Sequence, residues 1–181
     1  MARNSLETFA LGVASEWGPL SSELVDACRK RLEELLQAAA TEEWLDGLLR
    51  DAPLHRELWR DPACGFMLLA HTEPEGIYRP PHDHGRGWVM YGIIRGISEM
   101  GTYSRVSQVD GQVKLVKRNS TLVRAGEVQV YLPGDIHDTR CISGPSLLLR
   151  FTERDLKKEG HEAHMVTRYV QKDSDWVPEA P

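Results

Sequence analysis

The hydrophobic pattern of this chain changes near residue 65, and this change limits the folds that the chain can adopt. Before that point, apolar residues recur three and four positions apart, which is the spacing of amphipathic helices. After it, apolar residues form short runs, several of them alternating with polar residues, between glycine, proline and asparagine. The chain is therefore expected to be mainly β, with a barrel or sandwich that begins at about Gly65 and helices packed on it.

Three helices are predicted within the first fifty residues. Asn4, three positions before Glu7, predicts a capping box at the start of the first helix. Ser21 or Ser22 is expected to cap the second helix, and Thr41 the third. The apolar face of the second helix is predicted to consist of Leu20, Leu24, Ala27, Cys28, Leu32, Leu35 and Leu36.

Strands are predicted over seven segments: 66–70, 88–94, 97–106, 113–117, 128–132, 138–141 and 146–151. Asp110-Gly111 predicts a tight turn between two of them. A helical turn is expected within 153–162 and a last strand within 165–170. No repeat or linker indicates a second domain, so a single domain is predicted: a helical segment 1–52, a barrel 53–172 and a tail 173–181.

Composition argues against several classes of function. The formal charge is −5, and the 22 basic residues are scattered among 27 acidic ones, so no nucleic-acid partner is expected. No apolar stretch approaches the roughly 18 residues of a membrane span, and the N-terminus lacks a secretory pattern, so a cytoplasmic protein without membrane contact is expected. Three distant cysteines indicate neither a disulfide framework nor a thiolate zinc site. An exposed sheet edge is compatible with a homodimer.

Two histidines follow a pair of prolines in the β-rich part of the chain: His82 and His84 come directly after Pro80 and Pro81, separated by one residue. Side chains two positions apart on an extended chain point to the same face, so both imidazoles can bind one ion. Prolines favour an extended backbone and donate no ladder hydrogen bond, which suits the rim of a barrel. For this motif alone, two surface histidines on a loop are the alternative.

A third histidine, His137, follows a turn marked by Pro133 and Gly134, so it is expected at the start of a strand. Three neutral imidazoles on one side of an ion leave coordination positions open, as in non-haem iron enzymes. We therefore predict a metal site formed by His82, His84 and His137. The other four histidines are expected to be ordinary surface or core residues, with His71 the first exception to consider: His55, His71, His161 and His164.

The two histidine blocks resemble the paired motifs of the cupin superfamily. The HDH form, with a glycine twelve residues beyond His84, is similar to that of cysteine dioxygenase and related thiol dioxygenases. The resemblance extends from about Trp59 to Phe151. It implies a double-stranded β-helix, or jelly-roll barrel, with N-terminal helices packed on it and Fe(II) held by the three histidines. Val89 and its neighbours replace the glutamate that many cupins carry in the first motif, which implies a three-histidine site.

The same resemblance places Arg60 where thiol dioxygenases keep the arginine that clamps the substrate carboxylate. A planar guanidinium binds a carboxylate through two parallel, charge-assisted hydrogen bonds, which fixes its orientation. An exposed arginine paired with Glu57 or Asp61 is the alternative. Arg79 and Arg86 flank the histidines and offer the same chemistry.

The segment Ser146–Arg150 departs from the thiol dioxygenase pattern, which has a serine, a histidine and a tyrosine at alternate positions. Leu148 replaces the histidine and Arg150 the tyrosine, while Val89 replaces the cysteine that crosslinks to that tyrosine in mammalian-type enzymes. If Arg150 points inward, its charge favours an anionic ligand. In the alternative, Arg150 lies at the strand end and extends to solvent.

We therefore expect a metal-dependent dioxygenase that acts on a small anionic organic substrate, a thiol among the candidates, with dioxygen as second substrate. Arg60 and Arg150 are the expected substrate-binding, catalytic residues. One alternative is a non-catalytic or sensory cupin that binds a metal and a small anion. Another is a non-redox isomerase or lyase with Zn, Mn or Ni, because the ligand type does not separate these metals from iron.

Overall fold

The computed structural model describes residues 3–108, 113–161, 165–173 and 175–179. Four helices lie in this part of the chain: α1 (Ser5–Glu16), α2 (Ser22–Leu35), α3 (Glu43–Asp51) and α4 (Leu156–His161). The strands there are β1 (Arg56–Arg60), β2 (Met67–Glu73), β3 (Tyr78–His82), β4 (Val89–Ser107), β5 (Val113–Arg124), β6 (Val128–Tyr131), β7 (Ile136–Thr152), β8 (Tyr169–Lys172) and β9 (Asp175–Pro178).

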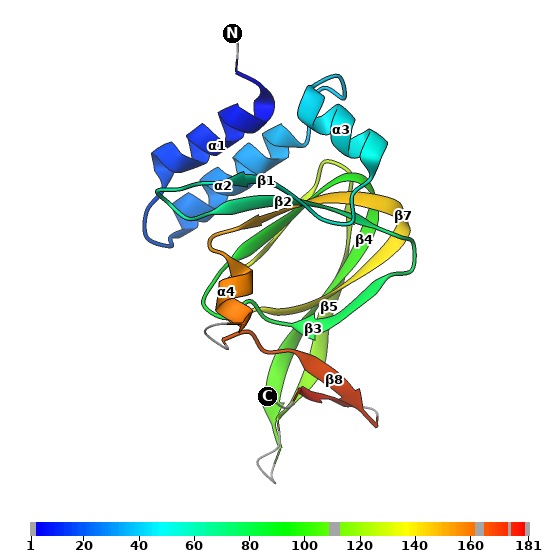
Figure 1. Ribbon diagram of the computed structural model, residues 1–181. Coiled ribbons are helices and arrows are strands. Elements are labelled where there is room, and N and C mark those ends of the chain that lie inside the picture. Colours follow the sequence, from blue (N-terminus) through cyan, green and yellow to red (C-terminus); the bar gives the residue numbers. More distant parts are fainter. Residues whose placement is uncertain (1–2, 109–112, 162–164, 174, 180–181) are drawn as a thin grey trace.

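Two long strands, β4 and β7, organise an antiparallel sheet of seven strands. β7 pairs with β4 on one side; on its other side, its first half pairs with β3 and its second half with β2. β4 in turn pairs with β6 near its start and with β5 beyond it. The β4–β7 register shifts several times between Ile93 and Ser98, and such bulges bend strands. The sheet rolls around an interior (Figure 1), which confirms the mainly β, double-stranded β-helix class expected from the sequence.

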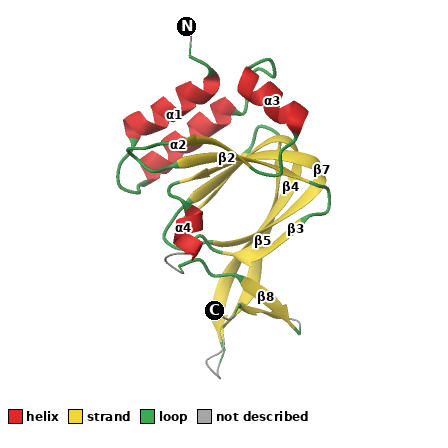
Figure 2. Cartoon of the chain, viewed as in Figure 1, coloured by secondary structure: helices red, strands yellow, loops and turns green. Residues whose placement is uncertain are grey.

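The N-terminal helices cover one side of this sheet (Figure 2). Aromatic rings join the two layers: Trp17 lies 5.1 Å from Phe66 between ring centroids, and Phe9 lies 6.1 Å from Phe151. Gly92 of β4 permits close contact with α2 and the residue after it, since a Cβ at this position would lie 3.0 Å from Leu36 Cδ1. The buried apolar residues of the helices thus share one core with those of β2, β4 and β7.

Most of the predicted helix boundaries are confirmed. Asn4 forms the capping box with Glu7, and Ser21 caps α2. Thr41 does not cap α3; its N-cap is Glu42, whose carboxylate instead accepts hydrogen bonds of 2.8 Å from the backbone N–H and hydroxyl of Ser5. This contact between the starts of α1 and α3 replaces a local cap.

The β-rich part differs from the sequence prediction in its extent. The first strand is β1, which precedes Gly65, and β4 and β7 each contain two segments that were predicted as separate strands. The last predicted strand, 165–170, is only partly correct, because β8 begins at Tyr169 and pairs with β9 in a two-stranded sheet. The turn predicted at Asp110-Gly111 lies outside the described residues. No helix among the described residues is long and apolar enough to cross a membrane.

Leu32→Ala is expected to lower the free energy of unfolding by about 2–5 kcal/mol, because it leaves a cavity in the shared core. The Leu32 side chain is fully buried. Urea unfolding followed by circular dichroism measures this change. Leu20→Ala is the matched control, since Leu20 is 49 % exposed and precedes α2, and we expect a change within about 0.5 kcal/mol. Equal effects of the two substitutions would contradict the packing described.

Candidate metal centre and its pocket

The pairing of β3 with β7 brings the three predicted ligands together. His82, the last residue of β3, is the register partner of His137, the second residue of β7. His84 follows in the loop that leads to β4. The prolines before His82 are part of β3 and leave the backbone extended, as expected. The predicted grouping of His82, His84 and His137 is therefore present.

The geometry of the three rings suits a single ion. One ring nitrogen from each histidine lies within 4.8 Å of those of the other two. His84 Nε2 and His137 Nε2 are 2.9 Å apart, and the ring centroids of His82 and His137 are 4.7 Å apart. With metal–nitrogen bonds of about 2.0–2.1 Å, two ligand atoms are at most about 4 Å apart, so the group is close to coordination spacing. The three histidines can hold a metal ion.

Neighbouring groups orient these rings. His82 Nδ1 lies 2.9 Å from the carbonyl oxygen of Pro80, and a hydrogen bond donated there leaves Nε2 free for a metal. The ring of His137 stacks on Tyr131 with centroids 3.8 Å apart. The hydroxyl of Tyr91 lies 3.4 Å from His84 Nε2. The contacts of His82 and His137 thus limit ring rotation, whereas Tyr91 approaches the His84 nitrogen that faces His137.

Burial keeps the three imidazoles neutral, which is the protonation state that binds metals. Burial is the largest cause that lowers the pKa of His84, to about 2, and the pKa of His137, which falls well below its ordinary value. It also lowers the pKa of His82. A metal that binds here does not have to displace protons from these rings at neutral pH.

Asp83, between the two histidines of the first motif, points away from the metal site and holds the loop in place. Its Oδ1 accepts hydrogen bonds from the backbone N–H groups of Gly85 and Thr167, at 3.0 and 2.9 Å. Its Oδ2 accepts one from Arg105 at 2.7 Å. Gly85 adopts a left-handed conformation (φ 63°), and a Cβ there would lie 2.9 Å from Met165 Cβ, so the loop lies directly against the C-terminal segment.

Asp138 has the same role beside His137. Its carboxylate accepts hydrogen bonds from the hydroxyls of Tyr78 and Tyr103, at 2.9 and 2.5 Å, and from the backbone N–H of Gly101 at 2.8 Å. Sequence analysis missed both aspartates. Their position next to the ligands was the available signal, since neighbouring residues on a strand point to opposite faces.

His82 and His84 lie on the wall of a cavity of about 710 Å³, and His137 lies behind them, outside the cavity lining. β2 and β7 form another wall of the cavity. Every second residue of each strand lines it, so one face of each strand points inward. This wall consists of Met67, Leu69, His71 and Glu73 from β2 with Leu148, Arg150 and Thr152 from β7. His71, named as the first exception among the remaining histidines, is therefore a pocket residue, and so is His55.

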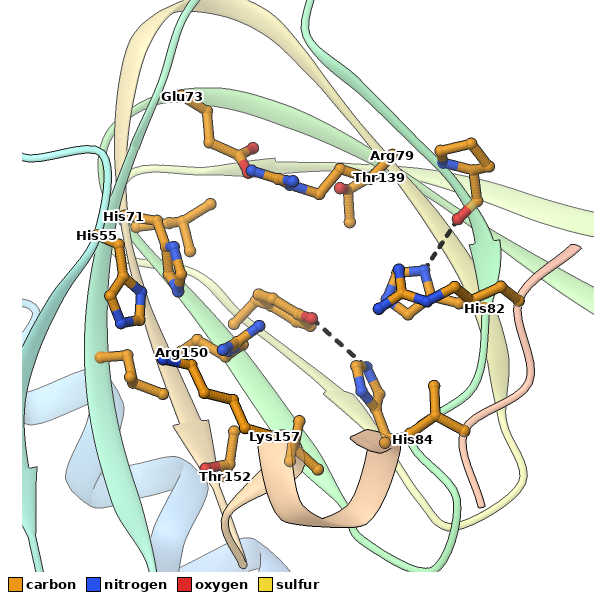
Figure 3. Close-up of a pocket in the computed structure, with 18 of the residues that line it drawn as sticks. His55, His71, Glu73, Arg79, His82, His84, Thr139, Arg150, Thr152 and Lys157 are labelled. Atoms are coloured by element: carbon orange, nitrogen blue, oxygen red, sulfur yellow. Dashed lines mark hydrogen bonds and ion pairs between the residues drawn. The ribbon is translucent and has the colours of Figure 1, made fainter. Parts of the chain in front are cut away.

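Arg150 faces this cavity. In Figure 3 its guanidinium lies between His71 and His84. Its Nε is buried and has no hydrogen-bond partner among the described residues, and no carboxylate in that part of the chain forms an ion pair with it. After burial, the charge of Arg150 is the next cause that lowers the pKa of His71, to about 3. The pocket thus contains an uncompensated positive charge.

Arg60 also lines the cavity, but carboxylates already hold its guanidinium. Nε and Nη2 donate to Glu57 at 3.1 and 2.9 Å, and Nη1 donates to Asp155 at 2.9 Å. Arg79 pairs with Glu73 at 2.7 Å, whereas Arg86 pairs with Glu159 and does not line the cavity.

No protein-family model matches this chain, and no curated protein matches it either. Among solved structures, it is similar to KdgF from Halomonas sp., with 17 % identity over 54 % of this chain and 74 % of that one and a TM-score of 0.42. It is also similar to the cupin domain of Cnp3 from Schizosaccharomyces pombe, with 13 % identity over 61 % and 66 % of the two chains and a TM-score of 0.43. BH2720 from Bacillus halodurans matches 78 % of this chain and 83 % of its own at 12 % identity, with a TM-score of 0.47.

His137→Ala is expected to abolish metal retention, because only two of the three imidazole ligands, His82 and His84, would remain. Metal content after purification without oxygen measures the effect. His55→Ala is the control, since His55 lines the same cavity outside the ligand group. Equal metal content in the two variants would show that the three rings do not bind one ion.

Asp83→Asn is expected to weaken metal binding by about tenfold, because supporting groups around a metal site commonly change affinity by this amount or more. The substitution removes the carboxylate partner of Arg105 and loosens the loop between His82 and His84. Titration of the apoprotein with Zn(II) measures the affinity. In the control Asp26→Asn, an exposed helical carboxylate changes and the affinity stays the same. An unchanged affinity in Asp83→Asn would contradict the role assigned to the loop anchor.

Proposed function

We propose that this protein is a non-haem Fe(II) dioxygenase of the thiol dioxygenase-like type, which acts on a small anionic organic substrate. The observation that supports this proposal most directly is the grouping of three neutral imidazoles at one cavity: His82 and His84 line it together with Arg150, whose guanidinium has no ion-pair partner among the described residues, and His137 completes the group. When bound, the iron would supply adjacent open positions for substrate and dioxygen, and the redox chemistry that inserts oxygen.

His82, His84 and His137 would hold the iron, and their supporting contacts would keep the open side of the ion directed into the cavity. Tyr91 and Tyr131 form the aromatic surround of His84 and His137. Burial raises the pKa of both tyrosine hydroxyls, so they stay protonated, and Tyr91, which lines the cavity, can donate a hydrogen bond to a ligand at the metal.

Arg150 would bind the anionic group of the substrate. Arg150 is partly buried, and its Nε has no hydrogen-bond partner among the described residues, so a carboxylate that enters the cavity can pair with the guanidinium and compensate its charge. The family resemblance assigns this role to Arg60, which remains a candidate at the cavity wall. Arg60 would have to exchange Glu57 or Asp155 for the substrate, whereas Arg150 needs to give up no carboxylate.

The substrate is not expected to be cysteine bound as in the mammalian-type enzymes. Leu148 lines the cavity where the resemblance implies a histidine, and Arg150 stands in place of the tyrosine. These replacements exchange a hydrogen-bond relay for an apolar group and a fixed cation. We therefore propose a small anionic substrate and dioxygen as partners, and neither nucleic acid nor a membrane.

Arg150→Gln is expected to lower kcat/KM by about 10- to 100-fold, because one charge-assisted hydrogen bond to a carboxylate contributes about 1.5–3 kcal/mol. The measurement is oxygen uptake by protein reconstituted with Fe(II) under anaerobic conditions, screened with thiols, diketones and small carboxylic acids. Arg95→Gln is the control, since Arg95 is an exposed residue of β4 outside the cavity.

If none of these compounds supports oxygen uptake, the proposed dioxygenase activity is contradicted. Retention of metal and binding of anions without turnover would instead support a metal- and anion-binding cupin. Turnover without oxygen consumption, restored by Zn(II), Mn(II) or Ni(II), would support a non-redox isomerase or lyase.

A further inference from the structure

Two side chains of β2 each direct one unpaired polar atom into the cavity. His71 and Glu73 are separated by one residue, so their side chains lie on the same inward face. His71 Nε2 and Glu73 Oε2 are buried, and neither has a hydrogen-bond partner among the described residues. Buried polar atoms are normally paired, so two of them in one pocket wall point to a ligand group that pairs with them.

Both side chains offer an acceptor to the cavity. Burial lowers the pKa of His71 to about 3, so its ring is neutral at neutral pH. A neutral imidazole has one nitrogen with a proton and one with a free lone pair, and in the tautomer protonated at Nδ1 the unpaired Nε2 is the acceptor. In Glu73, Oε1 accepts from Arg79 at 2.7 Å, and Oε2 remains as a second acceptor. The Glu73 side chain is only 5 % exposed.

His71 and Glu73 lie at successive inward-facing positions of β2, at increasing distance from Arg150 of the paired strand β7. Arg150 is the register partner of Leu69, His71 that of Leu148, and Glu73 that of Ser146. Inward-facing positions on a strand are about 6.5–7 Å apart, so the order along the wall is Arg150, His71 and then Glu73. Figure 3 shows Arg150 between His71 and His84, whereas Glu73 lies beside Arg79. The cavity therefore changes from donor to acceptor along one wall.

We propose that His71 and Glu73 form a subsite for a hydrogen-bond donor on the substrate, a hydroxyl or an ammonium group, a few bonds from the carboxylate that Arg150 binds. The substrate class is then a small hydroxy or amino acid rather than a plain carboxylic acid. This inference rests on the proposed function for the role of Arg150. It makes a separate claim about which carboxylates bind.

The test compares butyrate, 4-hydroxybutyrate and 4-aminobutyrate by calorimetry. Zn(II)-loaded and metal-free protein are both used, so that no turnover occurs. We expect at least one donor-bearing acid to bind about tenfold more tightly than butyrate, because buried groups built to pair with a donor reject an analogue without it. Comparison of 4-hydroxybutyrate with 4-aminobutyrate shows whether the preferred donor is a hydroxyl or an ammonium group. Equal affinities of all three acids would overturn the subsite.

His71→Phe keeps a ring of similar size without the acceptor. Glu73→Gln keeps an oxygen for Arg79 and places an amide donor where Oε2 was. Both variants are expected to reduce the preference to less than threefold while butyrate binding stays close to that of the wild type. Glu75→Gln is the matched control, because Glu75 is exposed and lies outside the cavity lining. A preference that persists in both variants would overturn the assignment to these residues.

The outcomes separate this inference from the proposed function. A donor preference in a protein that never consumes oxygen would contradict only the dioxygenase. Oxygen consumption that does not distinguish donor-bearing acids from plain acids would contradict only the subsite.

Discussion

The pairing of β3 with β7 is the contact on which the candidate site depends. It places His82 opposite His137 in register, and His84 then lies 2.9 Å from a histidine 53 positions away in the sequence. A shift of one residue in this register would turn alternate side chains to the other face of the sheet and separate the rings. The contacts that fix the register are therefore as important to the site as the ligands themselves.

Two buried aspartates provide such contacts, each next to a ligand histidine and directed to the opposite side. Asp83 joins the first histidine motif to Arg105 and to the C-terminal segment at Thr167. Asp138 joins β7 to Tyr78 of β3 and Tyr103 of β4. Alternation along an extended chain thus gives each short motif two functions: one residue faces the cavity, and its neighbour fixes the position of the backbone.

The charge distribution within the cavity follows from the same alternation. β2 and β7 contribute every second residue to its wall, and these residues include one cation, Arg150, and two acceptors, on His71 and Glu73. Where the thiol dioxygenase pattern has a polar relay, this chain has Leu148 and Arg150. The three histidines that can hold a metal ion are present, whereas the cavity wall carries an apolar group and a cation at the positions of that relay.

The fold class, the grouping of His82, His84 and His137, and the capping of α1 and α2 could be predicted from the sequence alone. These features depend on local patterns: the period of apolar residues, the spacing of the histidines and the caps. Tertiary structure decided that β4 and β7 run unbroken, that Glu42 binds Ser5 where Thr41 was expected to cap α3, and that Arg60 pairs with Asp155, 95 residues away. It also placed His71 and Glu73 in the cavity with Arg150. Those outcomes depend on strand register and long-range contacts, and a linear pattern of residues does not encode which distant partner a side chain meets.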